Sequence, residues 1–134
     1  MKPAYSFKFE VPFGDIDMMG HVNNVRYLAY FENARVRHMY SILGDWNFED
    51  VGLILAHAEI DYKSVAKLRD ELTVNLRIMS VGNSSWVYEY EIINEKEDRV
   101  IATGKTVQVA FDYKRRKPIP IPPEFKKQLL QQIS

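Results

Sequence analysis

The chain has 134 residues, the length of one ordinary domain, and 46% of them are hydrophobic, as in soluble globular proteins. Its 18 basic and 18 acidic residues balance, which argues against a general attraction to nucleic acids or anionic membranes. It has no cysteine, so disulfides, thiolate catalysis and zinc–thiolate sites are excluded. Because neither a signal-peptide pattern nor a run of ~20 apolar residues is present, we expect a cytoplasmic protein.

The first third of the chain predicts a strand followed by one long helix. Residues 4–13 alternate between apolar and polar, which is typical of a half-buried strand. Asn23 or Asn24 is expected to cap a helix of about eighteen residues that stops at Gly44. This helix is apolar on nearly every side, so we expect it to be largely buried.

The remainder predicts strands joined by short turns. They are expected over residues 53–63, 72–78, 86–92 and about 99–113, with a hairpin loop at 94–98. In the first of them, Ile54, Ala56, Ala58, Ile60 and Tyr62 should share one face, opposite Leu53, Leu55, His57, Glu59 and Asp61. The proline-rich segment 117–123 cannot enter a sheet interior, and residues 124–133 predict a short terminal helix.

One helix among strands, without alternating βαβ units, favours an α+β fold with an antiparallel sheet. A sheet that curls around the single long helix would explain why that helix is so apolar. We find no internal repeat or domain boundary and expect a single domain over residues 1–134.

Polar residues crowd the junction between the first strand and the helix, over residues 13–24. Asp15, Asp17, His21, Asn23 and Asn24 all fall there. The first N–H groups of a helix have no intrahelical acceptor. A carboxylate beside such donors is the kind of arrangement that attacks or polarises a carbonyl group.

The run FGDIDMMGHVNNVRYLAYFENAR resembles hotdog-fold acyl-thioester hydrolases of the 4-hydroxybenzoyl-CoA thioesterase type. Its HVNN segment is similar to the form found in acyl-ACP and long-chain acyl-CoA thioesterases. Weaker likenesses cover residues 59–62, 70–74 and 116–122. The resemblance implies a five-stranded antiparallel sheet wrapped around one long central helix, with a short C-terminal helix. It also implies a homodimer or homotetramer whose site lies at a subunit boundary.

The resemblance further implies hydrolysis of acyl-CoA thioesters, with coenzyme A as part of the substrate and no bound cofactor. Asp17 corresponds to the acid that attacks the carbonyl or activates water, and a backbone N–H near Asn24 would polarise the carbonyl. His21 would either assist or pack under the helix start, and Asn23 and Asn24 serve as caps or site walls. Met19 departs from the acyl-ACP branch, which has asparagine there.

Other polar residues permit a functional or a plain interpretation. His57 and Glu59, two apart on a strand, could face a pocket or a dimer seam, or be solvated. Lys114, Arg115 and Arg116 could hold the phosphates of coenzyme A, or form a solvated turn. The scattered histidines give no metal-site pattern, and we expect no metal.

Two alternatives to an acyl-CoA thioesterase remain. The first is a thioesterase that acts on acyl carrier protein. The carrier protein would then dock on the basic residues Lys114, Arg115 and Arg116. The second is a non-catalytic acyl-thioester-binding protein of the same fold, against which the intact Asp17 argues. The motif of a hotdog dehydratase or hydratase is absent.

Overall fold

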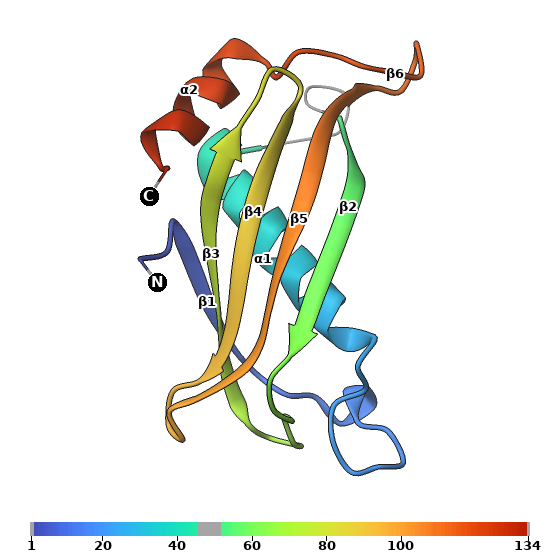
Figure 1. Ribbon diagram of the computed structural model, residues 1–134, viewed down its shortest axis with the longest axis vertical. Helices are drawn as coiled ribbons and strands as arrows, with labels where there is room; N and C mark the ends of the chain where they lie inside the picture. Colours follow the sequence, from blue (N-terminus) through green and yellow to red (C-terminus); the bar gives the residue numbers. More distant parts are fainter. Residues whose placement is uncertain (1, 46–51, 134) are drawn as a thin grey trace.

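The computed structural model describes residues 2–45 and 52–133 and shows one helix lying across an antiparallel sheet (Figure 1). The expected single domain over residues 1–134 includes residues 1, 46–51 and 134, which lie outside this description. The elements are β1 (Tyr5–Glu10), the 3₁₀ turn η1 (Phe13–Asp15), α1 (Arg26–Leu43), β2 (Leu53–Tyr62), β3 (Glu71–Val81), β4 (Ser85–Asn94), β5 (Arg99–Asp112), β6 (Lys117–Pro118) and α2 (Pro123–Gln131).

The strands are ordered β1-β3-β4-β5-β2, every neighbouring pair is antiparallel, and the short β6 pairs with the end of β5. This arrangement confirms the predicted α+β fold of hotdog type. None of the helices described is long and apolar enough to cross a membrane.

The core lies between α1 and the inner face of the sheet. The alternating residues of β3 and β4 contribute eight of its side chains, and all are at most 1% exposed: Leu72, Val74, Leu76, Ile78, Trp86, Tyr88, Tyr90 and Ile92. Phe31 of α1 stacks on Tyr90, with ring centroids 4.4 Å apart. The helix approaches closely because Gly104 of β5 lies directly beneath Phe31 and has no side chain.

The predicted faces of β2 are wrong at its start because the strand contains a β-bulge between Leu55 and His57. An extra residue in a strand reverses the alternation beyond it. Leu53 and Leu55 therefore share the inner face with Ala58, Ile60 and Tyr62, since their partners on β5 are Ala110, Gln108, Thr106, Gly104 and Ala102. His57, Glu59 and Asp61 stay together, on the outer face.

The long helix differs from its prediction in two respects. It begins at Arg26 and its N-cap position is Val25, so neither Asn23 nor Asn24 is the cap residue. It is also not buried on every side, because Leu28 and Tyr40 are exposed while Arg35 and His38 are buried. The predicted stop at Gly44 is confirmed by its φ of 67° and by its N–H, which donates to the Tyr40 carbonyl at 2.9 Å.

The C-terminal helix closes the end of the core distant from the α1 start (Figure 1). Phe125 packs edge-on against Trp86, with centroids 5.2 Å apart. His38 of α1 contacts the Tyr88 hydroxyl through Nδ1 at 2.8 Å and Gln132 Oε1 through Nε2 at 2.7 Å. Burial lowers the pKa of His38, which favours the neutral ring.

Candidate active site

The polar junction folds into a narrow hairpin over residues 15–23, here called the site hairpin. Ile16 and Val22 form an antiparallel bridge, the Asp17 N–H donates to the His21 carbonyl at 3.1 Å, and the Asn23 N–H donates to the Asp15 carbonyl at 2.9 Å. Gly20 makes the reversal with a φ of 87°, a conformation that favours glycine. The site hairpin therefore has a fixed shape of its own.

Hydrogen bonds to β2 and the segment after it help to attach the site hairpin and the helix start to the rest of the domain. The Val22 side chain is buried, and its N–H donates to the Ala66 carbonyl at 2.8 Å. The Tyr62 hydroxyl, at the end of β2, donates to the Asn24 carbonyl at 2.9 Å. Both contacts keep the site hairpin beside the start of α1 and the end of β2, at the lower right of Figure 1.

Asp17 presents a carboxylate that is only partly engaged. Its Oδ1 accepts a hydrogen bond from the Met19 N–H at 2.8 Å, and its side chain is half-buried. Among the residues that the structure describes, Oδ2 has no hydrogen-bond donor. The side chains of Met18 and Met19 are exposed. One oxygen is thus fixed in orientation while the other can act on a substrate or a water molecule.

Asp15 is engaged through both oxygens. Its Oδ2 accepts from the Tyr30 hydroxyl at 2.6 Å, and its Oδ1 lies 3.0 Å from Arg26 Nε. Burial, and then the hydrogen bond to Asp15, raise the pKa of Tyr30 far above its usual range. Asp15 orients the hairpin, and its carboxylate has little freedom to react.

The turn that leads into α1 contributes a backbone donor. Within residues 2–45 and 52–133, the Asn24 N–H has no acceptor. The neighbouring Asn23 side chain accepts from the Val25 N–H at 3.0 Å, so it shapes the turn just before the helix. His21 is half-buried and its Nδ1 lies 3.5 Å from the Val22 carbonyl oxygen, which is a weak contact.

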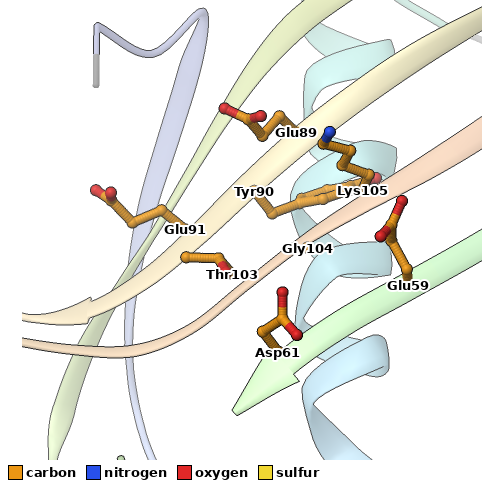
Figure 2. A pocket seen from close by; sticks show the side chains of 8 residues that line it. All are labelled: Glu59, Asp61, Glu89, Tyr90, Glu91, Thr103, Gly104 and Lys105. Carbon is orange, nitrogen blue, oxygen red and sulfur yellow. The ribbon is translucent and has the colours of Figure 1, made fainter. Parts of the chain in front are cut away.

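His57 and Glu59 lie away from this junction. Their side chains are exposed on the outer face of the sheet, with His57 Nε2 3.6 Å from Glu59 Oε1. Glu59 lines a hollow of about 250 Å³ on that face. Figure 2 shows that α1 lies on the other side of the sheet from this hollow. The carboxylates of Asp61, Glu89 and Glu91 also line it and outnumber its one cationic side chain, Lys105, so its charge disfavours an anionic ligand.

Lys114, Arg115 and Arg116, here called the basic turn, connect β5 to β6. The N–H groups of Lys114 and Arg115 donate to Asp112 Oδ1 at 2.9 and 3.1 Å, and with the nearby cationic side chains they lower the pKa of Asp112. The basic turn lies beside the start of β2, whereas the site hairpin lies beside its end (Figure 1). Ten residues of strand separate the two, which is roughly 30 Å.

Of the residues predicted for the site, the structure brings together Asp17, His21, Asn23 and Asn24, and separates them from the other two groups. In the described part of the chain, no three His, Asp or Glu side chains are grouped closely enough to hold a metal ion. Sequence reasoning missed the hydroxyls of Tyr30 and Tyr62, because an aromatic residue in an apolar pattern indicates core packing.

Comparison with known proteins gives a consistent assignment. Residues 11–129 match the family model described as the Thioesterase-like superfamily. Long-chain acyl-CoA thioesterase FadM of Escherichia coli K12 is 28% identical over 120 residues, covering 88% of this chain and 91% of its own.

Solved structures agree with this assignment. A thioesterase from Thermus thermophilus, complexed with coenzyme A and Zn, is 31% identical, with a TM-score of 0.84 and coverage of 95% of this chain and 98% of its own. A 1,4-dihydroxy-2-naphthoyl-CoA thioesterase from Synechocystis is 25% identical, with a TM-score of 0.84 and coverage of 94% and 95%.

Proposed function

The chain belongs to the Thioesterase-like superfamily, and from this membership we propose that it hydrolyses acyl-CoA thioesters to a free acid and coenzyme A. It is a thioester hydrolase, as its named relatives are. The closer likeness to the 4-hydroxybenzoyl-CoA type, and of residues 21–24 to acyl-ACP thioesterases, is part of the same proposal.

Asp17 is the proposed reacting acid. It either attacks the thioester carbonyl or removes a proton from the water that does so. In the first route the carboxylate forms a mixed anhydride as the C–S bond breaks and the thiolate leaves, and water then hydrolyses the anhydride to the free acid and the regenerated Asp17. In the second route water adds to the carbonyl carbon, the C–S bond breaks, and the proton taken by Asp17 passes to the departing thiolate. The supporting observation is that Asp17 Oδ2 and the Asn24 N–H both lack partners among the described residues and lie on one short segment.

The Asn24 N–H is the proposed oxyanion donor. The positive end of the α1 dipole, next to it, favours the negative charge that develops on the carbonyl oxygen. His21 would contact the bound thioester from the same hairpin, and Asn23 would wall the site by fixing the turn. Thioesters have a good leaving group, so one carboxylate and one or two donors can suffice.

We propose that two copies pair along β2. In the part of the chain that the structure describes, this ten-residue strand is bonded to β5 on one side only, and its inner-face residues Leu55 and Tyr62 are 47% and 48% exposed. Open edges of this length are normally covered or paired. A strand that pairs antiparallel with its own copy satisfies the symmetry of a twofold dimer.

Such pairing would bring the basic turn and the site hairpin, which lie at opposite ends of β2, close to each other across the dimer. The start of β2 in one copy would lie beside the end of β2 in the other. The basic turn of one copy would then approach the site hairpin of its partner, where it would bind the phosphates of coenzyme A. A tetramer of such dimers preserves this arrangement.

The assembly is tested with Leu55→Lys, which places a charge on the inner face of the open edge. We expect sedimentation to show a dimer for the wild type and a monomer for the variant. Leu130→Lys is the matched control, because Leu130 is 50% exposed on α2, and it should stay dimeric. A monomeric wild type at the concentration of the assay would refute the pairing.

The function is tested with a panel of aliphatic and aryl acyl-CoA substrates and a thiol reagent. We expect Asp17→Asn to lower kcat/KM by at least ~100-fold, the lower scale of general acid–base catalysis. Asp61→Asn is the matched control on the outer face and should retain activity. An Asp17→Asn variant that folds and keeps full activity would refute the mechanism, and a wild type without thiol release would refute the function.

A carrier-protein thioesterase is the alternative that the exposed basic turn favours. Acyl carrier proteins are acidic and could dock there electrostatically. Matched acyl-CoA and acyl-carrier substrates separate the two, since a carrier enzyme should lose turnover on its carrier when Arg115 and Arg116 are neutralised and show little activity on acyl-CoA.

A further inference from the structure

The side chain of Tyr30 links the core to the site hairpin. It lies on the second turn of α1, is 5% exposed, and contacts the rings of Phe9 and Tyr27, with ring centroids 4.5 and 5.9 Å away. Burial and these two contacts leave the ring little freedom. Its hydroxyl reaches out of this packing to Asp15 Oδ2 at 2.6 Å.

Asp15, held by Tyr30, contacts both strands of the site hairpin. Its carbonyl accepts the Asn23 N–H at 2.9 Å, and Asp17 is only two residues further along the chain. Asn23 precedes the proposed oxyanion donor. One residue thus joins the helix, the reacting acid and the peptide that leads to the helix start. The ion pair of Asp15 with Arg26 adds less, because the Arg26 side chain is 51% exposed.

We propose that Tyr30 and Asp15 act as positioning residues that set the distance between the Asp17 carboxylate and the Asn24 N–H. The proposal rests on the function given above. Neither residue needs to touch the substrate. Both act by keeping the carboxylate and the oxyanion donor at a separation that suits a single thioester carbonyl.

The test uses Tyr30→Phe, which removes the hydroxyl and keeps the ring. Tyr90→Phe is the matched control, because Tyr90 is also buried and its hydroxyl contacts Thr106 at 2.6 Å and Arg35 at 3.3 Å, neither of which belongs to the site hairpin. We expect Tyr30→Phe to lower kcat about 10- to 100-fold, the scale of a 1 Å misplacement, with a much smaller change in KM. Tyr90→Phe should lose stability and keep kcat.

Two further comparisons test whether Tyr30 and Asp15 act through Asp17. In an Asp17→Asn enzyme, adding Tyr30→Phe should lower kcat no further, because the carboxylate that Tyr30 positions is gone. Asp15→Asn, which keeps an oxygen acceptor for Tyr30, should retain more activity than Asp15→Ala. Equal losses of kcat in the Tyr30→Phe and Tyr90→Phe enzymes, or full additivity with Asp17→Asn, would overturn the proposal.

Amide hydrogen exchange separates failure of this proposal from failure of the proposed function. The Asn23 amide should exchange faster in Tyr30→Phe than in the wild type, and should be unchanged in Tyr90→Phe. This readout needs no substrate. If the wild type hydrolyses no thioester, the function fails while exchange still measures the restraint, and an unchanged Asn23 rate overturns the restraint even in an active enzyme.

Discussion

Gly104→Ala should destabilise the fold strongly, because α1 and the sheet meet at this residue. A Cβ at Gly104 would lie 2.6 Å from the Glu59 carbonyl oxygen and 2.9 Å from Phe31 Cζ, with Phe31 Cε2 closer still. The Phe31 ring cannot move aside easily, since it is fully buried and stacked on Tyr90. The Glu59 oxygen belongs to the neighbouring strand backbone, so relief on that side requires β2 to shift.

The expected loss follows from these two contacts. Overpacking a core by one methyl group costs about 1–3 kcal/mol, and a strained ladder hydrogen bond adds about 1 kcal/mol. We therefore expect the free energy of unfolding to fall by roughly 3 kcal/mol. For a chain of this size that corresponds to a decrease in Tm of roughly 10 °C.

Urea unfolding followed by tryptophan fluorescence and far-UV circular dichroism measures the effect. Gly14→Ala is the control, because a Cβ there meets nothing within 4 Å. It should change the free energy of unfolding by less than about 1 kcal/mol. If Gly104→Ala unfolds at the same urea concentration as Gly14→Ala, the close approach of α1 to β5 is not what the structure indicates.

Three other substitutions or conditions test separate parts of the structure. Burial lowers the pKa of His38, so at mildly acidic pH the unfolded chain binds a proton that the folded chain does not. The contribution of neutral His38 to the free energy of unfolding should be complete above the unfolded-state pKa of about 6.5 and should fall as the pH drops below it. Urea titrations at several pH values should show a weaker pH dependence for His38→Gln. Met19→Asn should change the Tm little, because the side chain is exposed and Asp17 is held by the Met19 backbone N–H; a large loss of stability would contradict this. Phe125→Ala should cost about 3–5 kcal/mol by denaturant titration, since the ring fills the space beside Trp86, and a loss below about 1 kcal/mol would show that α2 is not docked as described.

Most of the fold could be predicted because period-2 patterns were clear where one sheet face is buried. Val74 and Tyr90 alternate with polar neighbours, and both are fully buried as expected. The pattern failed at β2, where a single inserted residue between Leu55 and His57 changes the facing of Leu53 and Leu55. Hydrophobicity along a strand carries no signal for such a bulge when apolar residues stand on both sides of it.

The candidate site was predictable in part. Five polar residues close in sequence necessarily lie close in space, so the grouping of Asp17 with Asn24 required no tertiary information. The roles of Tyr30 and Tyr62 required it, because their partners lie 15 and 38 residues away in the chain. The same limit applied to the basic turn, whose position at the far end of β2 follows from strand order, which composition does not determine.

If the proposed pairing along β2 holds, protein concentration is a thermodynamic variable for this chain. If the edge is covered by a second copy, unfolding converts one dimer into two free chains, and mass action then enters the free energy. A hundredfold dilution would remove about 2.7 kcal/mol of apparent stability without any change in sequence, temperature or solvent. Two variants compared at unequal concentrations would differ in apparent stability for that reason alone. The variant obtained at the lower concentration would then be judged the less stable protein.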